Sequence, residues 1–164
     1  MAPAATGAFA VLSAINVALI AAIPSKEDRV TDEVVTSHVR ALMTSRPIDV
    51  VSSDQHTVKP WYAGKLDFSP PVTDFAAQGF ALAGGRVDYV NGRAVAALVY
   101  RDREHLIDLF VWPASQGEEA VTAIERRGFN VVHWSSGGMA YWAASDAEAA
   151  SLERLRQLVA ANAM

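Results

Sequence analysis

The chain contains no cysteine among its 164 residues. This absence excludes disulfide bonds, thiolate nucleophiles and cysteine-ligated zinc sites, but it fits a reducing and an oxidising compartment equally well. An excess of positive charge is also missing, because 14 Lys and Arg residues stand against 18 Asp and Glu residues and give a net charge of -4. We therefore expect no direct binding of nucleic acid, which needs a basic surface.

Charged side chains are also absent before Lys26, and residues 4–23 form a nearly continuous apolar run. As a helix this run would be about 30 Å long, which matches the hydrocarbon core of a membrane. We predict a transmembrane helix over residues 4–23. Two alternatives remain open. One is a cleaved signal peptide, for which the small residues Ala21 and Ala22 are suitable although no basic segment precedes the run. The other is an Ala-rich helix buried in a protein core.

The segment after the apolar run predicts a first soluble helix. Ser25 and Asp28 have the spacing of a capping box, and apolar residues then recur at helical intervals. Arg46-Pro47 marks the end of this helix, because the residue before a proline disfavours helical geometry. His38 falls on the apolar stripe. It is interpreted either as a histidine at the core edge with one hydrogen-bonded nitrogen, or as a ligand for a metal or signal.

Polar and aromatic side chains are most densely combined just after residues 48–51, a β-branched segment that predicts a strand. Asp54 is suited to cap a short helix that contains His56, Lys59 and Trp61. One interpretation is a rigid corner that ties the strand to a sheet, with the Lys59 side chain extended beside the aromatic rings or stacked on one of them. The other is an exposed recognition site, since loop aromatics beside a cation often bind ligands.

An antiparallel sheet is predicted from residue 80 onward, where the apolar pattern approaches a period of two. Gly84-Gly85 predicts a bulge, and Asn91-Gly92 predicts a type I′ hairpin turn. Residues 93–100 are apolar on both faces, which indicates an interior strand. The predicted strands are residues 80–90, 93–100, 105–112, 129–135 and 139–144.

Two further helices complete the predicted fold. Residues 116–127 are expected to form a short helix that ends at Gly128, and a capping box at Ser145 and Glu148 is expected to start a closing helix over residues 146–161. The fold class is therefore α+β. We expect an antiparallel sheet of about five strands, with N- and C-terminal helices packed on one face and a hydrophobic helix before them. Residues 25–162 would form one domain.

Two stretches resemble a known family. The first comprises residues 49–51 and the following residues 52–72, SSDQHTVKPWYAGKLDFSPPV, and the second is residues 84–113, GGRVDYVNGRAVAALVYRDREHLIDLFVWP. Both resemble the extracytoplasmic half of bacterial transmembrane anti-sigma factors. The resemblance covers residues 37–146. It implies a single-pass protein of the inner (cell) membrane whose C-terminal domain lies in the periplasm or outside the cell. Such proteins hold a sigma factor inactive and release it on an envelope signal.

In that family a cytoplasmic domain, often helical and zinc-binding with His and Cys ligands, makes the contacts with the sigma factor. This sequence has no Cys and no such domain before the apolar run. We therefore expect either a part of a longer protein or an unusual short member, which reaches its sigma factor through a region absent here. Lys26 and Arg29 taken alone would favour the opposite orientation, with the C-terminal side inside the cell.

Candidate site residues follow from these segments. His56, Lys59, Trp61 and Arg86 are candidates for contact with a ligand or signal. His38, His56 and His105 could bind Zn²⁺ or Cu²⁺ if the fold brought them together. No cofactor is expected, and no enzyme either, because local spacing completes no nucleophilic or general-acid arrangement. The alternatives are a membrane-anchored periplasmic binding domain and a small hydrolase that uses His56 or His105.

Overall fold

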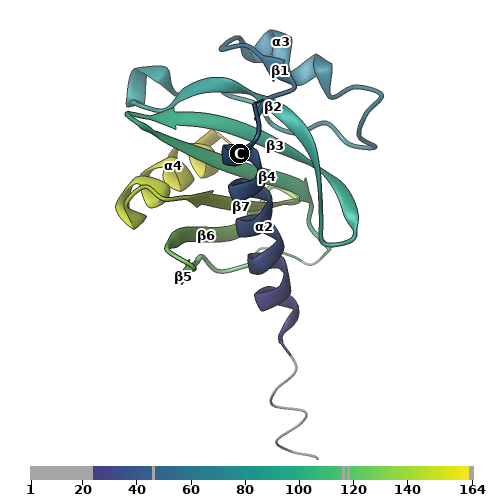
Figure 1. The fold of residues 1–164 in the computed structure, drawn as a ribbon. Coiled ribbons are helices and arrows are strands. Elements are labelled where there is room, and N and C mark those ends of the chain that lie inside the picture. The colour runs from purple at the N-terminus through teal and green to yellow at the C-terminus, as the bar shows by residue number, and fades with distance from the viewer. Residues whose placement is uncertain (1–23, 46, 116, 118, 163–164) are drawn as a thin grey trace, which may run out of the picture.

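A seven-stranded antiparallel sheet forms the centre of the computed structural model, which describes residues 24–45, 47–115, 117 and 119–162 (Figure 1). The predicted transmembrane helix at residues 4–23 lies outside these residues. The described elements are α2 (Lys26–Met43), β1 (Val50–Val51), α3 (Gln55–Trp61), the 3₁₀ helix η1 (Ala76–Gln78), β2 (Ala81–Val90), β3 (Arg93–Asp102), β4 (His105–Pro113), β5 (Thr122–Arg126), β6 (Phe129–Ser136), β7 (Met139–Ser145) and α4 (Ala149–Asn162).

The strands lie in the order β1-β2-β3-β4-β7-β6-β5. Strands β2, β3 and β4 form the predicted meander, β5, β6 and β7 form a second one, and the two meanders join where β4 pairs with β7. The α+β class is confirmed. The prediction of about five strands was roughly right, and the sheet is wider because short strands flank it at both edges.

The helix predicted over residues 116–127 is wrong, because residues 122–126 form the edge strand β5. Thr122 and Ile124 are half-buried and alternate with exposed neighbours, which is the period of a strand with one covered face. Arg127 (φ 54°) and Gly128 (φ 81°) both lie in the left-handed region and form the tight turn into β6. The glycine that we assigned to a helix end therefore belongs to a hairpin.

The terminal helices cover opposite faces of the sheet, which corrects the prediction that both pack on one face (Figure 1). Alternate residues of the interior strands divide between two apolar cores, so Leu109 lies on one face and Phe110 on the other. The first core packs against α3 and α4, and the second packs against α2. Because both faces of the interior strands are apolar, each face needs its own cover.

Glycines shape the edge of the sheet next to α3. The register between β2 and β3 shifts at Gly84, as predicted for a bulge, and Gly84 has φ 144°. A Cβ atom there would lie 2.0 Å from the carbonyl oxygen of Val50, so the close pairing of β1 with β2 requires glycine. The Asn91-Gly92 turn is also confirmed, since both residues have positive φ and join β2 to β3.

One of the two predicted capping boxes is present. The Ser25 hydroxyl accepts a hydrogen bond from the Asp28 backbone N–H, and the Asp28 carboxylate accepts one from the Ser25 N–H, as predicted for the start of α2. Ser145 does not cap α4, which begins only at Ala149. Its buried hydroxyl instead donates to the Leu106 carbonyl and accepts from the Ala147 N–H. Ser145 therefore joins β7 to β4 rather than starting a helix.

Candidate functional site

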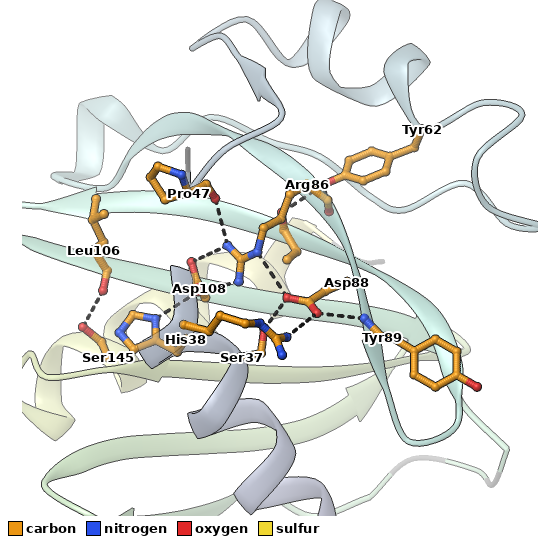
Figure 2. Close-up of polar contacts among 12 residues, drawn as sticks. Ser37, His38, Pro47, Tyr62, Arg86, Asp88, Tyr89, Leu106, Asp108 and Ser145 are labelled. Carbon is orange, nitrogen blue, oxygen red and sulfur yellow. Dashed lines mark hydrogen bonds and ion pairs between the residues drawn. The ribbon is translucent and has the colours of Figure 1, made fainter. Parts of the chain in front are cut away.

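A network of buried charges connects α2 to the sheet (Figure 2). The Arg86 guanidinium on β2 donates two hydrogen bonds to the Asp108 carboxylate on β4, at 3.1 Å and 2.7 Å. His38 Nδ1 on α2 donates to the same carboxylate at 3.0 Å. Asp108 is 2% exposed, and Arg86 and His38 are also buried. Sequence analysis selected Arg86 and His38 for different reasons. The structure brings both to Asp108, which sequence analysis did not select.

The sheet register explains how Arg86 reaches Asp108. Strand β3 lies between β2 and β4, and the residue of β3 directly opposite Arg86 is Ala97. A methyl side chain there leaves room for a long side chain to cross β3. The guanidinium lies 5.6 Å from the centre of the Phe110 ring, so its aliphatic and aromatic surroundings exclude water. The Pro47 carbonyl accepts a further hydrogen bond at 3.4 Å.

The network keeps its charged forms despite burial. Burial alone would raise the pKa of Asp108, but the hydrogen bond from His38 and the positive charge of Arg86 outweigh it and lower this pKa below its usual value. Burial would lower the pKa of Arg86, but the charges of Asp108 and Asp88 raise it above its usual value. The pair is therefore ionised at neutral pH, with both of the carboxylate oxygens hydrogen-bonded.

A second carboxylate, Asp88 on β2, extends the network along α2. It accepts hydrogen bonds from the Arg86 Nε at 3.2 Å, from the Arg40 guanidinium at 3.2 Å, and from the Ser37 hydroxyl in a very short contact. Ser37 is buried, whereas the Arg40 side chain is 66% exposed. The C-terminal half of α2 is thus fixed to β2 and β4 through two carboxylates.

The Asp108–His38 pair has the form of an orienting carboxylate and a base, but the described residues supply no group for it to activate. No described side chain hydrogen-bonds His38 Nε2, which is buried. The imidazole instead lies edge-on against the Phe129 ring, with 5.5 Å between ring centres. A general base must reach a nucleophile or water within hydrogen-bond distance. The observed geometry instead fits the predicted core-edge histidine with one hydrogen-bonded nitrogen.

The other candidates for contact with a ligand or signal lie on α3, which forms a corner next to the sheet. His56 and Lys59 are exposed on α3, and Trp61 is half-buried beside them. The cation that stacks on the Trp61 ring is Lys65, at 4.4 Å from the ring centre, rather than the predicted Lys59. Lys65 Nζ also donates to the Trp61 carbonyl at 3.1 Å. Lys65 lies in the turn beyond the end of α3, so helical spacing did not indicate this pair.

Tyr62 attaches the α3 corner to the sheet. Its hydroxyl donates to the carbonyls of Arg86 and Ala97, at 3.1 Å and 3.0 Å, and the whole side chain is buried. Burial raises the pKa of this phenol well above its ordinary value. A Cβ atom at Gly85 would lie 2.3 Å from the Tyr62 hydroxyl, so glycine is required where the ring meets the strand. The predicted corner that ties the strand to the sheet is therefore observed, and Tyr62 makes the attachment.

The three histidines of the metal hypothesis lie in different surroundings. His38 bonds to Asp108, His105 Nδ1 lies 2.9 Å from the exposed Asp146 carboxylate, and His56 is exposed on α3. Within the ranges that the structure describes, no three His, Asp or Glu side chains are grouped so that they could hold a metal ion. The histidine set is therefore not brought together.

Sequence analysis also missed a row of stacked rings under the start of α2. The His133 ring stacks on Trp142 at 4.0 Å between ring centres, and Trp142 stacks on Trp112 at 6.2 Å. These rings line a cavity of about 370 Å³ together with Glu27 and other residues of α2. His133 on β6 is paired directly with Trp142 on β7, which puts the two rings on the same face of the sheet. The sequence alone did not reveal this register.

Comparison with protein-family models, curated proteins and solved structures finds no match to this chain. Of the helices that the structure describes, none combines the length and apolar character needed to cross a bilayer.

Proposed function

We propose that this chain is the extracytoplasmic sensory and regulatory region of a membrane anti-sigma factor. The observation that carries the proposal is that the two stretches with the family resemblance form one packed unit. Residues 52–72 contain α3 and the loop after it, residues 84–113 contain most of the β2–β3–β4 meander, and Tyr62 joins the two through its buried hydroxyl. The two stretches that carry the resemblance therefore belong to one packed unit.

Specific residues of both stretches depend on each other. Tyr62 of the first stretch needs the glycine at position 85 of the second, because any side chain there would collide with the phenol. Arg86 and Asp108, both in the second stretch, form the buried ion pair that receives His38 from α2. Such a unit supports a role as a folded regulatory domain. In this role a signal changes the stability of the domain or the docking of its elements, and no catalysis is needed.

In this proposal, residues 4–23 span the inner (cell) membrane once and residues 25–162 lie on the extracytoplasmic side. The sigma factor is bound by a cytoplasmic region outside this sequence, and the domain acts on it through the membrane helix. Helix α2 directly follows the proposed membrane segment and is fixed to the sheet by Asp88 and Asp108. A change in the domain would therefore reach the membrane helix through α2.

A membrane-anchored ligand-binding domain is the second candidate. The cavity of about 370 Å³ beside Trp112 and Trp142 favours it, because this volume lies within the range of small-molecule sites. The two candidates differ in their output. A regulatory domain alters transcription, whereas a binding domain in transport or envelope maintenance does not do so directly.

The test is to delete residues 25–162 in the native gene, leave the remaining coding sequence in frame, and compare transcripts with those of the parent strain. We expect altered expression of one group of genes whose promoters share a recognition sequence for an alternative sigma factor. A matched strain with Gly117→Ala, at an exposed glycine with open space around it, should be unchanged. Unchanged transcription in the deletion strain would contradict the proposal.

A further inference from the structure

The two halves of α2 are attached to the sheet by different kinds of contact. In the C-terminal half, the buried residues Ser37 and His38 bond to the half-buried Asp88 carboxylate and the buried Asp108 carboxylate (Figure 2). In the N-terminal half, residues 26–33 carry four acidic side chains. Each of these four carboxylates accepts a hydrogen bond from, or forms an ion pair with, a residue outside α2. These contacts lie near the protein surface.

The contacts of the N-terminal half converge on the β5–β6 hairpin. The Asp28 carboxylate pairs with Arg126 at 2.7 Å, and Asp32 pairs with Arg126 at 3.3 Å and with Arg127 at 3.5 Å. Glu27 lies 2.9 Å from His133 Nε2. The carboxylates of Glu27, Asp28 and Asp32 are between 36% and 49% exposed, so water and salt screen these pairs.

Glu33 makes the fourth contact, to the opposite side of the helix base. Its carboxylate accepts a hydrogen bond from the Asn91 backbone N–H in the β2–β3 turn, at 2.6 Å. This contact is also exposed. The charged contacts of the N-terminal half therefore reach two hairpins at the surface, beside the buried residues Val30 and Thr31 of the same half.

Packing below this half is incomplete. The cavity of about 370 Å³ lies between the first turns of α2 and the rings of Trp112, Trp142 and His133. Val30 lines this cavity and is buried in the same apolar cluster as Val34 and Val35 of the following turn. Val30 is therefore the apolar contact that opening of residues 26–33 must break, while the rest of this face borders the cavity.

We propose that residues 26–33 act as a releasable latch, which opens from the β5–β6 hairpin while the rest of α2 remains docked on Asp88 and Asp108. Opening breaks the pairs to Arg126, Arg127 and His133 and exposes the stacked rings beneath. The signalling role of the latch rests on the proposed function, because α2 would then transmit tension from the membrane helix. The opening itself is a property of the domain and does not depend on a sigma factor.

Hydrogen–deuterium exchange of the full chain in detergent micelles tests the latch. Raising the salt concentration from 50 mM to 1 M should speed exchange of the amides of residues 30–33 while those of β3 and β4 remain protected. Arg126→Gln should produce the same local change at low salt, by about fivefold, which corresponds to about 1 kcal/mol at 1.4 kcal/mol per tenfold. The matched control is Arg156→Gln, which removes a comparable pair with Glu153 on α4 and should leave α2 unchanged.

A charge exchange provides the second arm. Asp32→Arg combined with Arg127→Asp should show slower exchange in residues 30–33 than Asp32→Arg alone, because the attraction is re-formed with opposite signs while Asp28 keeps its capping box. The latch is contradicted if these amides exchange only when β3 and β4 also open, at either salt concentration. That result would contradict the latch but not the proposed function. Unchanged transcription in the deletion strain would contradict the proposed function but not the latch.

Discussion

Asp108 shows how a single residue can determine the arrangement of several elements. It is a carboxylate within an otherwise apolar strand segment, and it is ionised because Arg86 and His38 both donate to it. Removing one partner from such a group leaves the others buried without a countercharge, which costs more than the pair contributes when intact.

We therefore predict that Asp108→Asn lowers the free energy of unfolding by about 3–5 kcal/mol, because Arg86 would remain buried with its main countercharge removed. Urea denaturation followed by circular dichroism measures this change. The matched control is Asp146→Asn, which removes the exposed partner of His105 and should cost at most about 1 kcal/mol. A similar loss of unfolding free energy in both variants would contradict the stabilising role assigned to the buried network.

Gly85 provides a second prediction at the same scale. We expect Gly85→Ala to destabilise the fold by about 1–3 kcal/mol, because the added methyl group would lie 2.3 Å from the Tyr62 hydroxyl and force the ring or strand to move. Gly117→Ala adds a methyl group in open space and should change stability by no more than about 0.5 kcal/mol. Thermal denaturation of both variants would reveal the difference, and equal midpoints would contradict the close packing.

At the scale of elements, α3 depends on the sheet for its position. It is a short helix that contains Pro60, and short isolated helices are not stable alone. The Tyr62 hydroxyl supplies two buried hydrogen bonds to carbonyls of β2 and β3. The corner should therefore loosen locally when this hydroxyl is removed.

We predict that Tyr62→Phe destabilises the protein by about 1–2 kcal/mol, because the one hydroxyl proton that the two carbonyls share is lost. Hydrogen exchange should rise in α3 more than in β6 and β7. The control is Tyr89→Phe, whose hydroxyl donates to the Gly92 carbonyl from a side chain that is 68% exposed. An equal loss of stability in both variants would contradict the role assigned to Tyr62.

Local signals in the sequence predicted several elements correctly. The Asn91-Gly92 turn, the bulge at Gly84 and the cap at Ser25 depend on backbone preferences of neighbouring residues, so short stretches suffice. β5 was missed because residues 116–127 have an acidic start and a basic end, which imitate a helix with a favourable dipole, and only the pairing of residues 122–126 with β6 makes them a strand. Ser145 was misassigned because its partner, the Leu106 carbonyl, is distant in sequence.

The same distinction applies to the candidate site. Arg86 and His38 were noticed individually, but their meeting point is set by the order β2-β3-β4 and by the placement of α2 on that face. Asp108 gave one signal, a lone carboxylate between Ile107 and Leu109, which we did not use. Long-range pairings of this kind are fixed by topology, which the apolar pattern alone leaves open.

At the scale of the whole molecule, the ionised carboxylates predict sensitivity to acid. The folded state lowers the pKa of Asp108 below the value of about 3.9 expected for an unfolded chain, so this group stabilises the fold above that pH. The pKa of Glu153, beside Arg156, is also lowered. Both contributions are lost as the pH falls through the lowered values.

We therefore expect the midpoint of urea denaturation to fall steeply below about pH 4, because the unfolded chain then binds protons that the folded carboxylates resist. A series of denaturation curves from pH 2 to pH 6 measures this change. In Asp108→Asn the decline should be shallower. An unfolding midpoint that is as high at pH 3 as at pH 6 would contradict the ionised state of the network.

The central claim is that this domain belongs to a regulator of a sigma factor, and co-purification tests it most directly. The natural gene product would be isolated from its own membranes through an affinity tag placed after residue 164, and mass spectrometry would identify the tagged chain and whatever it retains. The account predicts a membrane-embedded product with a cytoplasmic region and a bound alternative sigma factor. A product that retains no sigma factor would contradict it.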